Sequence, residues 1–331
     1  MENIKYQALI VEETFEGKFR HEIKEKYIEE LPPGEVTIQV AYSTLNYKDA
    51  LSFSGHKGIT KNYPHTPGID ASGIVVESLV PEFTIGDEVL VTGYDLGMNT
   101  SGGFQEYIRV PSKWVVKLPP NLDLKKAMIY GTAGFTAGLA IHRFQSNGIT
   151  PDTGKILVTG ASGAVGTISI AILKKIGYEV IASTGKPELK NFLLQIGAKE
   201  VISREDVAVE SNRPLLPRRW KAAIDNVGGQ TLVSIARQLE KGGAIAVIGI
   251  VTGDKFELPV YPFILRGIAL LGIESAETEM PLRLKIWEQL NSNWCIENFD
   301  ILYNEITLDE VPSALTKMLQ GKLAKKTIVK L

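Results

Sequence analysis

The stretch KILVTGASGAVG, residues 155–166, decides the fold of this chain. A run of apolar and β-branched residues ends in a cluster of glycine, alanine and serine. A helical pattern follows, with apolar positions at Val165, Ile168 and Ile172, and Gly177 stands where the C-terminus of that helix is expected. A strand, a glycine-rich turn and a helix in succession form the context of a dinucleotide-binding fingerprint.

The fingerprint is close to the G-x-G-x-x-G pattern, with one substitution. Its three glycine positions are Ala161, Gly163 and Gly166, and Gly160 sits one place early. Gly163 would let the backbone approach a pyrophosphate, and Gly166 would let helix and strand pack closely. A strand-to-helix turn that binds no ligand remains the alternative. The predicted pyrophosphate contacts are Ser162, Gly163, Ala164, Val165 and Gly166.

The pattern of predicted secondary structure differs between the N-terminal third of the chain and the part that contains this motif. From Tyr6 to about Leu118, short β-type runs alternate with Gly, Pro and Asp clusters, whereas from about Lys125 strands and helices alternate. The sequence therefore predicts an α/β protein with a doubly wound, parallel Rossmann sheet and a β-rich N-terminal domain. We expect domains at 1–124 and 125–298, with residues 299–331 returning to the first domain through the strand KKTIVKL.

Composition excludes several classes of protein. The 331 residues are 44% hydrophobic and carry a formal net charge of −2, which gives no general attraction to nucleic acid or to acidic lipid. No apolar run is long enough to cross a membrane, and the N-terminus lacks a signal-peptide core, so we expect a cytoplasmic protein. A single cysteine, Cys295, excludes an internal disulfide and a cysteine-cluster zinc site.

The end of the second predicted strand bears on the choice of dinucleotide. NAD-selective proteins place Asp or Glu there to bind the ribose 2′-hydroxyl, but this strand ends in Ser183, Thr184, Gly185 and Lys186. Hydroxyls and a cation suit a 2′-phosphate, and Arg204, just past the third strand, lies within reach of the same pocket. The sequence predicts NADPH, with a solvated Lys186 beside a turn as the alternative.

Several further motifs carry a family resemblance over the whole chain. They are TLNYKDAL (44–51), PGIDASG (67–73), GDEV (86–89), GTAGFTA (131–137), ASGAVG (161–166) and PFILR (262–266). The chain resembles a zinc-free medium-chain dehydrogenase/reductase with a GroES-like N-terminal domain, of the quinone oxidoreductase-like, YhdH-type acrylyl-CoA reductase subfamily. A short-chain dehydrogenase is disfavoured, because no tyrosine is followed four residues later by lysine.

The resemblance also bears on metal. Zinc-dependent relatives carry ligands where this chain has Asn46 and Ile69-Asp70, and its four histidines lack a metal-like spacing. We therefore expect no metal, and reduction of an already polarised acceptor as the reaction.

The NYKD segment is the one that the resemblance places at the active site. Tyr47 is the predicted proton donor or cofactor contact, Asn46 would orient it or the substrate carbonyl, and Lys48 or Asp49 would relay a proton. Two alternatives stay open: Asn46 and Asp49 only cap a helix, or Tyr47 only contacts the cofactor and water is the donor.

Other expected contacts combine fold logic with resemblance. Because ligands lie beyond the carboxyl ends of parallel strands, residues 226–228 and Ile250 should flank the nicotinamide. The resemblance adds Thr132, Ser275 and Gly321 to the NADPH site.

The substrate stays open between three readings. The first is a short enoyl-CoA, most simply acrylyl-CoA; the second is a quinone or a free enone or enal; the third is a non-catalytic NADPH-binding protein. Candidate partners for CoA phosphates are Lys57, Lys61, Arg213, Arg218 and Arg219, with solvated charge clusters as the alternative. The segment GIALLGI (267–273), near a sheet edge, predicts a homodimer.

Overall fold

A computed structural model describes residues 4–331 of the chain and divides it into two compact units. Unit 1 comprises the described part of Met1–Thr132 together with Ala276–Asn291 and Tyr303–Leu331. Unit 2 comprises Ala133–Ser275 and Ser292–Leu302.

Unit 1 is built on β-sheets. A two-stranded hairpin is formed by β1 (Lys5–Glu13) and β2 (Phe19–Tyr27). A seven-stranded sheet has the order β14-β15-β3-β4-β5-β7, with β6 also paired to β3. Its strands are β3 (Val36–Thr44), β4 (Asp70–Ser78), β5 (Glu88–Thr92), β6 (Tyr107–Val110), β7 (Val116–Lys117), β14 (Tyr303–Thr307) and β15 (Lys326–Lys330).

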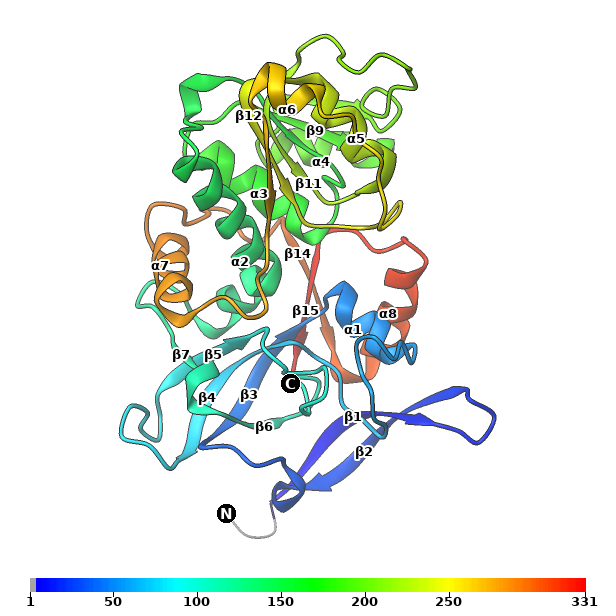
Figure 1. Ribbon diagram of the computed structural model, residues 1–331. Coiled ribbons are helices and arrows are strands. Elements are labelled where there is room, and N and C mark those ends of the chain that lie inside the picture. Colours follow the sequence, from blue (N-terminus) through cyan, green and yellow to red (C-terminus); the bar gives the residue numbers. More distant parts are fainter. Residues whose placement is uncertain (1–3) are drawn as a thin grey trace. The chain divides into compact units, whose positions relative to one another are not determined.

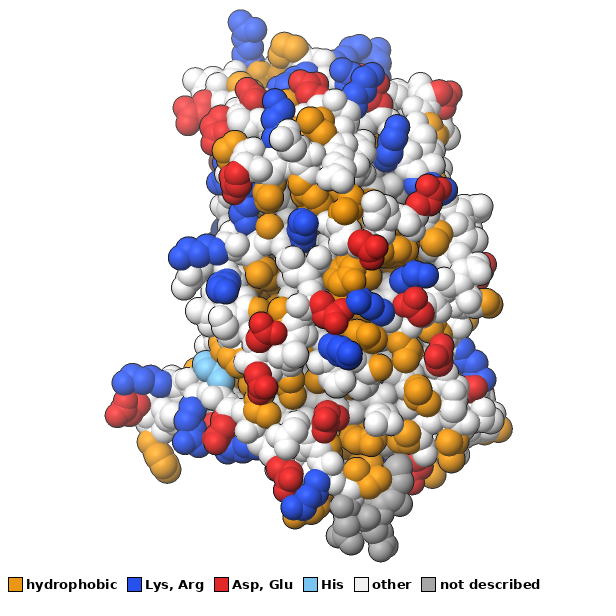
Figure 2. Space-filling view, turned by 180° about the vertical axis from the view of Figure 1, so that it is seen from behind, with side chains coloured by type: hydrophobic (Ala, Val, Ile, Leu, Met, Phe, Trp, Pro, Cys, Tyr) orange, Lys and Arg blue, Asp and Glu red, His pale blue; other side chains and the backbone are white. Residues whose placement is uncertain are grey.

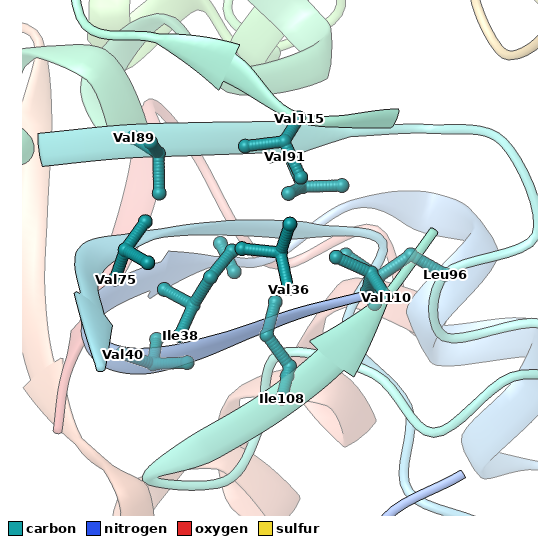
Figure 3. Close-up of a cluster of buried hydrophobic side chains, with 11 residues drawn as sticks. Val36, Ile38, Val40, Val75, Val89, Val91, Leu96, Ile108, Val110 and Val115 are labelled. Carbon is teal, nitrogen blue, oxygen red and sulfur yellow. The ribbon is translucent and has the colours of Figure 1, made fainter. Parts of the chain in front are cut away.

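The core of this sheet follows from alternation along its strands. In β3 every second residue, Val36, Ile38 and Val40, faces the same cluster, as the two-residue period of a strand requires. Valines dominate this cluster (Figure 3), because β-branched side chains pack well on a pleated surface.

The chain's last described strand completes the sheet of unit 1. Strand β15 pairs in parallel with β14 and antiparallel with β3, so it lies inside the sheet and not at its edge. Figure 1 shows β15, in red, beside β3, in blue. The predicted return of the C-terminal segment to the first domain is confirmed. Four helices accompany these strands: α1 (Tyr47–Phe53), the start of α2 (Leu124–Ser146), α7 (Met280–Asn291) and α8 (Val311–Leu319).

Unit 2 is a parallel sheet of six strands in the order β10-β9-β8-β11-β12-β13. Counted within the unit this is 3-2-1-4-5-6, the order of a dinucleotide-binding Rossmann sheet, so the predicted fold class is confirmed. The strands are β8 (Ile156–Val158), β9 (Val180–Thr184), β10 (Glu200–Ser203), β11 (Trp220–Asp225), β12 (Leu239–Val247) and β13 (Ala269–Gly272). The helices between them are α3 (Ala164–Lys175), α4 (Lys190–Gln195), α5 (Gly229–Gln238) and α6 (Tyr261–Arg266).

The domain boundaries expected from the sequence stay a prediction, and the compact units differ from them at one segment. Helix α7 belongs to unit 1, although it falls within the predicted range 125–298. Its fully buried Arg283 donates to the carbonyl of Thr92, at 2.8 Å, and to that of Ala276, at 3.0 Å. These bonds fasten the helix to the end of β5.

Two surface properties bear on partners. No helix within residues 4–331 combines the length and the hydropathy that a membrane-spanning segment needs. On the face drawn in Figure 2, Lys and Arg side chains alternate with Asp and Glu and form no large patch of one sign. That distribution does not favour a nucleic-acid surface on this face.

Candidate functional site

The predicted catalytic residues lie at the start of α1 in unit 1. Asn46 precedes the helix, Tyr47 is its first residue, and Asp49 lies in its first turn. The Tyr47 side chain is 51% exposed, so its phenol is available to a bound molecule. Asp49 is fully buried. Of these two side chains, Tyr47 is therefore accessible to a bound molecule and Asp49 is not.

Asp49 acts on the backbone around it. Its two carboxylate oxygens accept the N–H of Ile69, at 2.9 Å, and the N–H of Asn46, at 2.7 Å. These bonds fix the start of α1 against the segment that enters β4. The geometry favours the capping role that sequence reasoning left open for Asp49.

Asp70, the first residue of β4, joins the segments of this region. Its carboxylate accepts the backbone N–H of Thr132, at 2.8 Å, the Thr132 hydroxyl, at 2.5 Å, and the Asn46 amide, at 2.9 Å. Asp70 therefore holds the predicted catalytic segment and the predicted nicotinamide contact together.

A buried lysine completes the cluster. The Lys326 ammonium, from β15, donates to Asn46 Oδ1 at 3.2 Å and is fully buried. Burial lowers the pKa of Lys326 to about 8, against the attraction of Asp70 and Asp49. Burial raises the pKa of Asp49 to about 7, and the like charge of Asp70 adds to that shift.

The residues at the expected zinc position do not fit a metal ion. The Asn46 amide is engaged by Asp70, by the Thr44 carbonyl and by the Lys326 ammonium, whose positive charge would repel a cation. Across residues 4–331, no group of three or more His, Cys, Asp or Glu is arranged to hold one. His21 stacks on Phe53.

The glycine turn of unit 2 has the geometry expected of a phosphate-binding loop. Gly160 adopts a left-handed φ of +56°, so it takes the turn role of the first motif glycine, which is alanine here. A Cβ on Gly166 would lie 2.6 Å from the Gly160 oxygen, which explains glycine at that position. Helix α3 begins at Ala164 after Gly163, without a side-chain cap on its first N–H groups. Such a helix terminus suits an anion.

The tip of β9 carries the groups predicted to select the cofactor. Ser183 and Thr184 are buried, and the Thr184 hydroxyl donates to Ser162 Oγ at 3.2 Å. The Arg204 guanidinium lies directly over Gly185, where a Cβ would come 1.7 Å from its nitrogen. The structure thus brings Arg204 and the β9 tip together, with Lys186 next in sequence.

Other predicted contacts follow the carboxyl ends of the strands in unit 2. Ile250 is 63% exposed after β12. Asn226, after β11, donates to the Thr159 carbonyl at 2.8 Å, while its Oδ1 is buried and without a hydrogen-bond partner in the described part of the chain. That acceptor is placed to meet a donor on a bound molecule. Ser275 ends the first segment of unit 2, and Gly321 follows α8 in unit 1.

Two of the five candidate CoA-binding cations make other contacts. Lys57 pairs with Glu13 at 2.5 Å and lies over the ring of Tyr63. Arg219 donates to the Asp206 carbonyl and stacks on Trp220, at the amino end of β11. Ligands of such sheets bind at the opposite, carboxyl edge, so Arg219 does not line that pocket.

Sequence reasoning missed two members of the buried cluster. Asp70 was noted only as a replaced zinc ligand, and Lys326 was not considered. The available signal was a lysine before the apolar run TIV in a strand expected to pack in a sheet.

The pKa shifts in this cluster predict how stability varies with pH. Because the folded pKa of Asp49 lies above its unfolded value, the folded chain binds the extra proton, and stability falls as pH rises from about 4 to about 7. Asp49→Asn should remove that component, a slope of at most about 1.4 kcal/mol per pH unit. Urea unfolding across this pH range measures it, with the exposed Asp309→Asn as control. An unchanged slope in Asp49→Asn would contradict the assignment.

Comparisons with known proteins agree with both units. Residues 32–120 match the alcohol dehydrogenase GroES-like domain, and residues 164–286 match the zinc-binding dehydrogenase domain. The putative quinone oxidoreductase YhfP of Bacillus subtilis is 46% identical over 98% of this chain and 99% of its own. Acrylyl-CoA reductase AcuI of Ruegeria pomeroyi is 38% identical over 98% of each.

Solved structures give the same result. The B. subtilis yhfP structure with NAD bound has a TM-score of 0.97 at 44% identity, covering 99% of this chain and all of that one. The Salmonella enterica yhdH oxidoreductase with NADP has a TM-score of 0.95 at 38% identity, covering 98% and 99%. With identity of this extent over nearly its whole length, the chain belongs to the medium-chain dehydrogenase/reductase family, in the quinone oxidoreductase-like branch that includes YhfP, YhdH and AcuI.

Proposed function

We propose that this chain is an NADPH-dependent reductase of conjugated carbonyl compounds, and that its substrate is a short enoyl thioester such as acrylyl-CoA. The observation that carries the proposal is the accessible Tyr47 phenol. It lies beside Asn46, which stands at the position of a zinc ligand and accepts a hydrogen bond from the buried Lys326 ammonium. A polarised double bond needs no metal to accept a hydride, whereas oxidation of an alcohol needs its proton removed first.

The chain's residues would divide the work as follows. A nicotinamide held by the residues of unit 2 would supply the hydride for Cβ of the double bond. Negative charge then develops on the carbonyl oxygen, where the Tyr47 hydroxyl is able to donate, and Cα takes up a proton from Tyr47 or from water. Asp49 and Asp70 hold Asn46, Tyr47 and Thr132 in place.

A second candidate, reduction of quinones or free enones, is favoured by one observation. Lys57 is paired with Glu13, and Arg219 lies at the amino edge of its sheet, so two of the five cations considered for CoA phosphates are otherwise engaged. Both activities also occur in the names of relatives: YhfP is named a putative quinone oxidoreductase and AcuI an acrylyl-CoA reductase.

The features of unit 2 also support a homodimer. Strand β13 stands at the edge of the six-stranded sheet, and the neighbouring α6 exposes Ile264 (69%) and Leu265 (55%). An open strand edge beside exposed apolar side chains suits a second copy across a two-fold axis. NADPH and CoA esters as reactants fit the cytoplasm as the location.

Turnover with defined acceptors tests the substrate. We expect purified protein to oxidise NADPH faster than NADH in the presence of acrylyl-CoA, and to act more slowly on crotonyl-CoA and on a simple quinone. Activity confined to the quinone would transfer the proposal to the second candidate. Absence of oxidation with every acceptor would leave a non-catalytic NADPH-binding protein.

Substitution at the β9 tip tests cofactor selection. Arg204→Ala should raise the NADPH Kd about tenfold to a hundredfold, because a hydrogen bond to a charged group contributes about 1.5–3 kcal/mol. Lys186→Ala should raise it at least several-fold, and both variants should spare NADH. Titrations of cofactor fluorescence measure this, with the exposed Lys190→Ala as control. Equal losses for both cofactors would overturn the 2′-phosphate assignment.

Removal of the phenol tests the proton donor. Tyr47→Phe should lower kcat more than it weakens NADPH binding, because the ring remains and only the donor is lost. Steady-state kinetics and cofactor titration separate the two effects, with Tyr27→Phe as an exposed control. An unchanged kcat would assign protonation to water, and a loss confined to NADPH affinity would make Tyr47 a cofactor contact.

A further inference from the structure

The Lys326 ammonium is a fully buried charge in unit 1. It shares a fully buried environment with two carboxylates, Asp49 and Asp70, which reach it from α1 and β4. No other charged group contributes to the shifts of Asp49 and Lys326. A buried charge costs several kcal/mol unless it is paired and hydrogen-bonded, so three of them in one place need a reason.

The backbone around this group is adapted to it. Lys325, directly before Lys326, has a left-handed φ of +63°, which is rare for a residue with a side chain. Gly131 interrupts α2 with a φ of +49°, and a Cβ there would lie 2.7 Å from Asp70 Oδ2 and 3.3 Å from Lys326 Nζ. Strain and a kink at two neighbouring segments mark a functional site more often than plain packing.

The hydrogen bonds show what the ammonium controls. It donates to Asn46 Oδ1, which leaves the amide nitrogen of Asn46 to donate to the Thr44 carbonyl and to Asp70. The orientation of the Asn46 amide is thereby set. Asp70 accepts from Asn46 and twice from Thr132, so the amide that Lys326 orients is tied through Asp70 to Thr132.

We propose that Lys326 is a positioning residue for the reaction: its ammonium orients the Asn46 amide, which Asp70 also holds, and through these two side chains it keeps Tyr47 and Thr132 in their working positions. The inference rests on the proposed reductase function. Lys326 touches neither substrate nor cofactor in this account. Its effect on turnover is transmitted through two side chains that it orders.

The rival explanation is that Lys326 only stabilises the fold. Buried ion pairs are often replaced by apolar residues without loss of stability, so a well-folded variant is attainable. Under the rival explanation such a variant would lose activity by the same factor at every pH, or not at all. Under the proposal the loss depends on pH, because the ammonium lowers the pKa of Asp49, and this buried carboxyl group, which holds the Asn46 N–H, is protonated more readily once the ammonium is gone.

The test compares Lys326→Met, which removes the charge at similar length, with Lys326→Arg, which keeps it, and with the exposed Lys330→Met as control. The assay is kcat from pH 5.5 to 9.5 with the best acceptor, alongside thermal unfolding and NADPH Kd. We expect Lys326→Met to lower kcat about tenfold to a hundredfold, as small misplacements in an active site do. The acid limb of its profile should move up by at least half a pH unit, while NADPH Kd stays within about twofold.

Lys326→Arg should keep the acid limb where the wild type has it. A uniform loss across pH in Lys326→Met, an unmoved limb, or unchanged kcat would each overturn the proposal. If Lys326→Met does not fold, the dependence of wild-type kcat on pH still tests the proposal. The proposal requires turnover to fall as Lys326 loses its proton above pH about 8, and a profile flat to pH 9.5 would refute it.

Failure of the proposed function gives a different result. In that case the wild type would reduce none of the acceptors, and the fluorescence of bound NADPH replaces turnover. Emission rises when the nicotinamide is immobilised, so Lys326→Met should lower it at unchanged Kd if Thr132 loses its fixed position. Equal emission from wild type and variant would then reject the role of Lys326.

Discussion

The burial of ionisable groups between α1, β4 and β15 is the constraint on which unit 1 depends. Asp70 cannot stay charged out of water without donors, and three segments distant in sequence supply or influence them: Asn46 before α1, Thr132 after the kink of α2, and Lys326 at the start of β15. Because hydrogen bonds tie Asn46, Thr132 and Lys326 into one cluster with Asp70, no segment can move alone without leaving a buried polar group unpaired. The precision of the candidate site follows from this mutual dependence.

Unit 2 depends on a different constraint, the close approach of backbone to backbone. The Gly160 oxygen lies so near Gly166 that no side chain fits between the end of β8 and the start of α3. The first N–H groups of α3 have no side-chain cap. A rigid set of donors is thus paired with the Arg204 cation beside Gly185. In unit 1 the site residues are held by hydrogen bonds to buried charged groups, whereas in unit 2 the turn is held by close backbone packing.

Much of this was predictable from local sequence, and the physical reason is periodicity. Alternating apolar residues in β3 and the helical repeat after Gly163 are properties of neighbouring residues, so they predict the β-rich domain and the Rossmann fold correctly. The functional roles of Tyr47 and Arg204 stay predictions, the first from the family resemblance and the second from its place just past the third strand.

The role of Lys326 was not predictable in that way. Its partner Asn46 is 280 residues away, and a lysine beside an apolar strand normally has its ammonium in water. Asp49 illustrates the same limit, since its spacing after Asn46 fitted both a proton relay and a cap. Only the N–H groups of Ile69 and Asn46 facing its carboxylate favour the second role.

The position of β15 has a consequence for biosynthesis. This strand inserts between β14 and β3, yet it is translated after the whole of unit 2, so the sheet of unit 1 keeps an open edge on β3 until then. Through that interval Asp49 and Asp70 have been made but their ammonium has not. All strands of unit 2 are therefore available for pairing before Lys326 is added to the buried cluster of unit 1. A chain interrupted before Lys326 would leave the ribosome with two like charges at an unfinished edge, a state suited to recognition by chaperones or proteases.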